Sequence, residues 1–130
     1  MRVAVETVGS DDLLALLEEH VEEMRSVSPP ESKHAFNADA LRTPEVSFFV
    51  ARDERELLGC GALLDLGGGN GEVKSMRTQR RHLRRGVASA ILSEILAAAR
   101  QQKMRHLFLE TGSQDHFEPA RKLYERFGFT

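Results

Sequence analysis

The sequence predicts an α+β protein (mixed α/β), in which a central sheet is flanked by helices. The expected order of elements is β-α-α-β-β-β-α-β-α, and three consecutive strands are too many for a doubly wound parallel sheet. The chain has 130 residues, about the size of one domain, and no internal repeat or long linker divides it. We therefore expect a single domain over residues 1–130.

The first third of the chain is expected to form one strand and two helices. Residues Arg2–Val8 alternate apolar and polar side chains, which is typical of a strand. Ser10 is a candidate N-cap for a helix over Asp11–Met24, which has acidic residues in its first turn and leucines at helical spacing. The two prolines of VSPPES then break the helix. A second, short helix is expected at Asn37–Arg42.

The rest of the chain predicts strands followed by longer helices. The expected strands Ser47–Arg52 and Leu57–Leu66 are joined by the charged turn DERE, and the glycine-rich turn GGGNG leads into a third strand, Glu72–Arg77. Three further elements follow: a helix over Gly86–Gln102, a strand over His106–Thr111, and a helix that begins near Pro119 and stops at Gly128.

Composition narrows the class of protein. The net charge of -2 argues against a general polyanion binder. Cys60 is the only cysteine, so no intrachain disulfide forms, as in a reducing compartment. The N-terminus has no long apolar segment typical of a secretory signal, and the most apolar helix is interrupted by Glu94 and too short to span a bilayer. We expect a cytoplasmic protein that does not bind membranes.

Arginines cluster where the third central strand leads into the long helix. Five of them lie between Arg77 and Arg85, immediately before Gly86. The first amides of a helix lack internal partners and favour an anion, and glycine lets a ligand approach the backbone closely. Neither a P-loop nor a G-x-G-x-x-G motif is present. The alternatives are a phosphate-bearing small molecule, a nucleic acid and a solvated loop, although the absence of interleaved aromatic residues counts against single-stranded nucleic acid.

Two motifs resemble the GNAT superfamily of N-acetyltransferases. The family pattern [QR]-x-x-G-x-[GA], between a strand and a long helix, falls on the six residues from Leu83 to Ala88. A second pattern, A-x-x-L-Y-x-x-x-G-F, matches without a break. Its fixed positions are Ala120, Leu123, Tyr124, Gly128 and Phe129. The resemblance covers nearly the whole chain and implies a mostly antiparallel central sheet with two splayed strands.

The resemblance implies an acetyl-CoA site and no metal. The backbone amides at the helix entrance would hold the pyrophosphate, and the pantetheine arm would pair with the edge of the third central strand. The implied pyrophosphate residues are Leu83, Arg84, Arg85, Gly86, Val87, Ala88 and Ser89. The implied pantetheine residues are Met76, Arg77 and Thr78. The five histidines show no metal-ligand spacing.

The resemblance also implies direct acetyl transfer to a primary amine in a ternary complex. Glu72 lies where some family members carry the base that deprotonates the amine. Tyr124, the only tyrosine, occupies the position of the acid that protonates the departing thiolate. A backbone amide near Met76 or Arg77 would polarise the carbonyl. The glutamates of the first helix, Glu18, Glu19, Glu22 and Glu23, either attract a cationic amine or form a solvated helix face.

The sequence departs from the family pattern at two places. Leu83 replaces the Gln or Arg of the first motif, so the side-chain contact from that position is lost. The C-terminal strands that usually follow the second motif are expected to be missing, and an open strand edge favours a homodimer. The alternatives to an enzyme are a non-catalytic acyl-CoA-binding or regulatory module and, with less support, a nucleic-acid-binding protein that uses the Arg77–Arg85 cluster.

Overall fold

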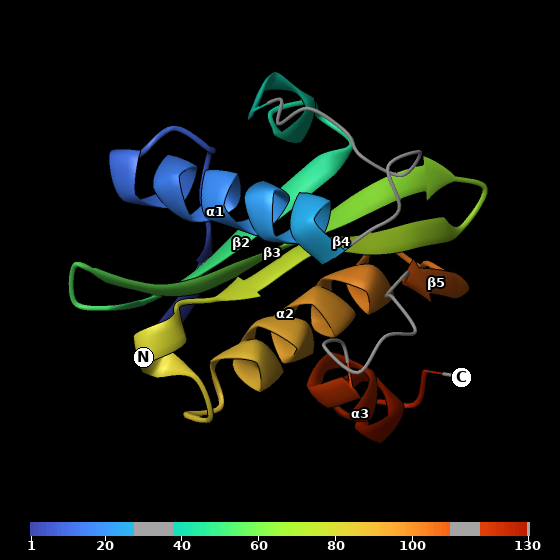
Figure 1. The fold of residues 1–130 in the computed structure, drawn as a ribbon. Coiled ribbons are helices and arrows are strands. Elements are labelled where there is room, and N and C mark those ends of the chain that lie inside the picture. The colour runs from blue at the N-terminus through green and yellow to red at the C-terminus, as the bar shows by residue number, and fades with distance from the viewer. Residues whose placement is uncertain (28–37, 110–117, 130) are drawn as a thin grey trace.

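The computed structural model describes residues 1–27, 38–109 and 118–129. They form one five-stranded sheet with the order β1-β2-β3-β4-β5 (Figure 1). The first three neighbouring pairs are antiparallel and β4–β5 is parallel, so the predicted mixed, mostly antiparallel sheet is confirmed. The strands are β1 (Arg2–Val5), β2 (Val46–Asp53), β3 (Glu56–Gly67), β4 (Asn70–Thr78) and β5 (His106–Leu109).

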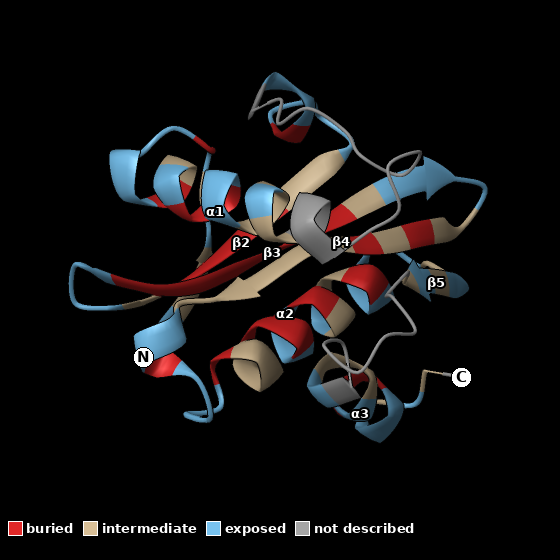
Figure 2. Cartoon of the chain, in the orientation of Figure 1, coloured by how far each residue is buried: buried red, intermediate tan, exposed pale blue. Residues whose placement is uncertain are grey.

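Helices cover both faces of this sheet. They are α1 (Asp11–Val27), α2 (Val87–Gln101) and α3 (Glu118–Arg126), with short 3₁₀ turns η2 (Ala38–Leu41) and η3 (Arg80–His82). Alternation along β2 separates two apolar clusters: Phe48 and Val50 pack with α1, whereas Phe49 and Ala51 pack with α2 and α3. Figure 2 shows the buried residues concentrated along β2, β3 and α2. The two faces are called the α1 face and the α2 face below.

The element boundaries follow the prediction with local differences. The first strand ends at Val5 instead of Val8, because Val8 leaves the sheet and is buried in the cluster around α1. The helix α1 continues to Val27, three residues beyond the predicted end. Gly128 ends the last helical segment as predicted, with a φ of 96° and a hydrogen bond of 3.1 Å from the Phe129 amide to the Tyr124 carbonyl. Asn37, Glu110 and Thr111 of the predicted elements lie outside the described residues.

Two arginines on the α1 face attach α1 to the sheet. At the start of the helix, Arg52 of β2 binds Asp12 at 2.7 Å and Glu6 at 2.8 Å. Its guanidinium holds the pKa of Asp12 at about 2, below the ordinary value. Later in the helix, Arg77 of β4 binds Glu19 and Glu23. These ion pairs attach α1 to β2 and to β4, the strand on which the candidate site lies.

Candidate active site

Only the first part of β4 pairs with β5 in the described structure. Residues Asn70–Val73 of β4 pair with His106–Leu109 of β5 in parallel register. The remainder of β4, up to Thr78, continues past the last described residue of β5. Within the described part of the chain, the second half of β4 is therefore bonded to β3 on one side only. This half contains Met76, Arg77 and Thr78, which were predicted to bind an extended ligand arm.

A β-bulge lies at the start of that open half. Ser75 and Met76 together oppose Gly61 of β3, because the register shifts between the pairs Ala62–Lys74 and Cys60–Arg77. Ser75 has a φ of 57°, in the left-handed region that residues other than glycine seldom adopt. Gly61 makes room for the bulge, since a Cβ there would lie 2.4 Å from the Met76 sulfur. A bulge redirects side chains and amides locally, and such features recur beside active sites.

The bulge and the pleat place β4 side chains on opposite faces. Val73 and Met76 pack in the α2-face cluster. Lys74 and Arg77 pair with residues of the α1-face cluster, and Glu72 is two residues before Lys74 on the same pleat. The predicted base, Glu72, is therefore on the α1 face, at the end of the described pairing with β5.

The predicted acid, Tyr124, is on the other face. It belongs to the α2-face cluster, is 8% exposed, and packs edge to face on Phe129 with the ring centroids 6.0 Å apart. Burial raises the pKa of its hydroxyl to about 12, so the group stays protonated at neutral pH and can donate a proton. Tyr124 also lines a groove of about 580 Å³ together with Leu107 and Leu109 of β5. Glu72 and Tyr124 thus lie on opposite faces of the sheet, close to the point where the described pairing of β4 with β5 ends.

The loop between β4 and α2 presents unpaired amides. Its backbone is left-handed at Arg84, with a φ of 64°, and at Gly86, with a φ of 78°, which caps α2. The first hydrogen bond of α2 runs from the Ala90 amide to the Gly86 carbonyl at 3.0 Å. The preceding amides of Val87, Ala88 and Ser89 therefore have no partner inside the helix. Nothing lies within 4 Å of the position that a Cβ would take on Gly86. The loop thus offers open space above unpaired donors, which fits a phosphate group.

The five arginines of the sequence cluster have different surroundings. Arg77 is 9% exposed at its side chain and binds Glu19 and Glu23 on the α1 face. These two glutamates therefore neutralise an arginine, which neither sequence interpretation of the acidic helix had anticipated. Arg81 binds Glu56 at 2.8 Å. The other three, Arg80, Arg84 and Arg85, are exposed at the loop surface.

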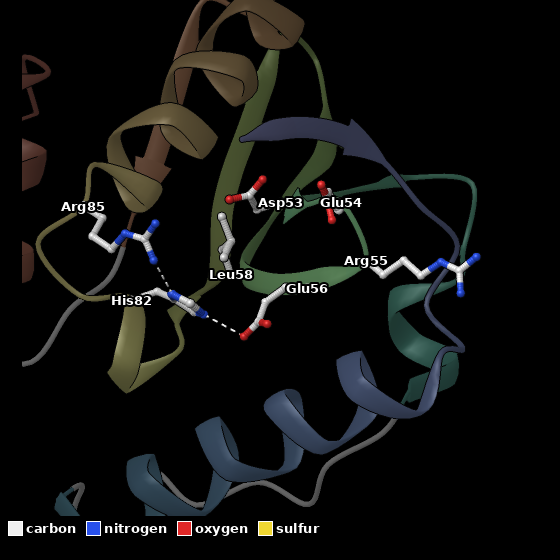
Figure 3. A pocket seen from close by; sticks show the side chains of 7 residues that line it. All are labelled: Asp53, Glu54, Arg55, Glu56, Leu58, His82 and Arg85. Carbon is white, nitrogen blue, oxygen red and sulfur yellow. Dashed lines mark hydrogen bonds and ion pairs between the residues drawn. The ribbon is translucent and has the colours of Figure 1, made fainter.

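Three further features of this region were missed by the sequence analysis. His82, just before the loop, is buried and its Nε2 lies 3.0 Å from Oε1 of Glu56, the first residue of β3. Arg85 Nη1 lies 2.7 Å from His82 Nδ1 (Figure 3). The third is the bulge at Ser75, where a serine and not a glycine has the left-handed backbone, so the sequence gives no sign of it. The contact of His82 with Glu56 joins residues 26 positions apart, so no local sequence pattern could have found it.

Other classes of site have no support in the described residues. Among them, no three His, Cys, Asp or Glu side chains group in a way that could hold a metal ion. None of the helices described is both long and apolar enough to cross a membrane. Cys60 is buried in the α1-face cluster, and burial raises the pKa of its thiol to about 12, which disfavours a nucleophilic thiolate.

Comparisons with known proteins agree with this arrangement. The sequence model of the acetyltransferase (GNAT) family matches residues 13–129. The uncharacterized N-acetyltransferase YsnE of Bacillus subtilis is 46% identical over 99% of this chain and 85% of its own length. The IAA acetyltransferase of Azospirillum brasilense is 34% identical over 98% of this chain and 82% of its own length. Among solved structures, a Klebsiella pneumoniae protein assigned as an acyl-CoA N-acyltransferase is 25% identical, with a TM-score of 0.75 over 99% of this chain and 82% of its own.

Proposed function

Because the chain belongs to the acetyltransferase (GNAT) family, we propose that it transfers an acetyl group from acetyl-CoA to a primary amine. The transfer is direct: the amine attacks the thioester carbonyl within a ternary complex, the carbon–sulfur bond breaks, and coenzyme A leaves as a thiol. The open edge of β4 and the adjoining helix entrance support this proposal, since they supply the two kinds of backbone donor that such a substrate needs.

In this proposal the substrate is held mainly by backbone groups. The amides from Arg84 to Ser89 bind the pyrophosphate, and the open space at Gly86 admits it. The arm of the substrate then extends along Met76, Arg77 and Thr78 and pairs with the free side of β4, as an added strand does. Leu83 is 55% exposed, but it has no polar side chain and its amide donates to the Arg80 carbonyl at 3.3 Å, so the donors begin at Arg84. Arg84 and Arg85 add positive charge beside the same amides.

Catalysis in this proposal uses the two faces of the sheet. Glu72 on the α1 face takes a proton from the amine, because a protonated amine cannot attack a carbonyl. Tyr124 on the α2 face protonates the departing thiolate, which fits its buried hydroxyl and its raised pKa of about 12. The thioester then lies between β4 and β5, beside the bulge at Ser75 and Met76. An amide of the bulge would polarise the carbonyl oxygen.

The observation that carries the proposal is the open, glycine-capped entrance of α2, and calorimetric titration with acetyl-CoA tests it. The Gly86→Glu variant should lose binding, because a charged side chain fills the space above the unpaired amides. Gly67→Glu is a matched control: Gly67 also has a positive φ, 84°, with nothing within 4 Å of its Cβ position, but it lies in the β3–β4 turn. Wild-type protein that does not bind acetyl-CoA, or equal loss of binding in both variants, would contradict the proposal.

An acceptor screen addresses the remaining question of the amine. Release of the coenzyme A thiol is followed with a chromogenic thiol reagent, with small amines, aminoglycosides and peptides as acceptors. IAA belongs in the same screen, because the A. brasilense relative is named for it. Turnover with any acceptor separates an enzyme from a module that only binds acyl-CoA.

The predicted homodimer is a further part of the proposal. Phe108 of β5 is 52% exposed beside the apolar groove that Tyr124 lines. Such an apolar side chain on a sheet edge is suited to a contact between two copies. Sedimentation equilibrium of wild-type protein and of Phe108→Glu tests this, and a monomeric wild type would refute it.

A further inference from the structure

A chain of three side chains links the start of β3 to the loop before α2. Glu56 Oε1 lies 3.0 Å from His82 Nε2, and His82 Nδ1 lies 2.7 Å from Arg85 Nη1. His82 is only 9% exposed, although it is a polar residue in a short loop. Figure 3 shows its ring between the two partners, at one side of a pocket of about 510 Å³. Both nitrogens of a buried ring are thus occupied by charged groups from two different segments.

The hydrogen-bonding capacity of the two partners determines which tautomer His82 adopts. A guanidinium group only donates hydrogen bonds, so Nδ1 of His82 must accept and carries no proton. The hydrogen is then on Nε2, which donates to the Glu56 carboxylate. The hydrogen bond from His82, followed by the nearby charge of Arg81, lowers the pKa of Glu56 and keeps it an acceptor. The carboxylate therefore selects the tautomer that Arg85 requires.

Arg85 lies in the most strained part of the loop backbone. It lies between Arg84 and Gly86, which both have left-handed backbones. A left-handed residue other than glycine is strained, so this turn needs contacts outside itself to keep its shape. The bond to His82 uses one amino group of the guanidinium, and the other N–H groups of Arg85 stay available as donors.

We propose that His82 is a positioning residue for acyl-CoA binding. The His82 ring, in the tautomer that Glu56 selects, holds the side chain of Arg85. The amides beside Gly86 and the remaining N–H groups of Arg85 then face the pyrophosphate. This inference rests on the proposed function, because it assumes that the loop binds acetyl-CoA. Preorganised donors bind more tightly because less ordering is left to occur on binding.

The test measures the dissociation constant of acetyl-CoA by calorimetry for a set of variants. His82→Leu keeps apolar volume and removes both hydrogen bonds, and Arg85→Met removes the other partner. Each should weaken binding by about tenfold, the equivalent of about 1.4 kcal/mol. His82→Gln, whose amide both donates and accepts, should stay within about threefold of the wild type. A purely structural role for the ring would not be rescued in this way.

A double variant tests whether His82 acts through Arg85. If it does, His82→Leu combined with Arg85→Met should again weaken binding by about tenfold, whereas independent effects would multiply to about a hundredfold. Glu56→Ala should weaken binding, because His82 Nε2 then loses its acceptor and the ring is held by Arg85 alone. Glu54→Ala is its matched control, since Glu54 lines the same pocket and its loss leaves the Glu56–His82 bond in place.

The outcomes separate this inference from the function on which it rests. Wild-type protein that fails to bind acetyl-CoA refutes the proposed function, and the role of His82 falls with it. Normal wild-type binding with unchanged affinity in His82→Leu, or a hundredfold loss in the double variant, overturns the role of His82 alone. Should circular dichroism show that His82→Leu is unfolded, Arg85→Met and Glu56→Ala decide the matter. Both change side chains of exposed residues, and wild-type affinity in both overturns the inference.

Discussion

Replacing Arg77 by Met is expected to destabilise the protein by loosening α1 from β4. The Arg77 side chain is 9% exposed and is held between Glu19 and Glu23 of the helix. Methionine retains most of the apolar stem but offers no donor. The change removes the most buried of the cations beside Glu23, whose own side chain is 19% exposed. Removing one member of a buried ion pair costs more than the pair contributes, because the remaining charge is still partly desolvated.

The size of the effect follows from the burial and from the chain length. We expect a loss of about 2–3 kcal/mol of unfolding free energy, in the range for a hydrogen-bonded charge that loses its partner. The unfolding entropy of a chain of 130 residues is about 0.27 kcal/mol per kelvin, so the melting temperature should fall by about 7–11 °C.

Urea denaturation followed by circular dichroism measures this loss. Arg80→Met is the control, because the Arg80 side chain is 79% exposed and lies 4.0 Å from Glu23, and it should change stability by less than about 0.5 kcal/mol. Adding Glu19→Gln and Glu23→Gln to Arg77→Met should recover part of the loss, since the two side chains that bound Arg77 are then neutral. If Arg77→Met unfolds within about 0.5 kcal/mol of the wild type, the two ion pairs do not hold α1 and the reasoning is wrong.

Three other predictions concern the candidate site and its surroundings. Tyr124 is the only tyrosine and no tryptophan is present, so absorbance titration should give a midpoint near pH 12, and a midpoint near 10 would show an exposed hydroxyl. Its pKa is raised on folding, so the stability it contributes is complete below pH 10 and is lost as the pH rises toward 12, by about 2–3 kcal/mol in total. A Tyr124→Phe variant should lose this alkaline dependence in urea denaturation. Cys60, with a pKa raised to about 12, should resist iodoacetamide in the folded protein and react fully in denaturant, as measured by mass spectrometry. Once an acceptor is known, Glu72→Gln should lower kcat by about a hundredfold with little change in acetyl-CoA affinity, and an unchanged kcat would remove Glu72 as the base.

Local patterns predicted most of the fold because they act over a few residues. The leucine spacing of α1, the turns DERE and GGGNG, and the glycines Gly86 and Gly128 placed every described strand and α-helix to within a few residues. The 3₁₀ turn η3 was expected only as part of a loop. The boundary of β1 was wrong for a reason that is not local. Val8 alternates correctly for a strand, but its burial against α1 removes it from the sheet. Alternation shows that apolar side chains recur at every second position, but it does not show which element will bury them.

The sequence by itself determined the glycine-capped entrance of α2 and the tyrosine of α3, because each belongs to a short contiguous motif. Only the tertiary structure decided what surrounds them. It paired Arg77 with Glu23 and Glu19, which are separated from it by 54 and 58 positions in the sequence. It also joined His82 to Glu56, 26 positions away. It also placed the bulge at Ser75, where a serine has a left-handed backbone. The pairing of β4 with β3 and the packing of α3 put Glu72 and Tyr124 on opposite faces of the sheet. Register and face are set by the pairing of distant strands and by the helices packed on them, and no local sequence pattern carries that information.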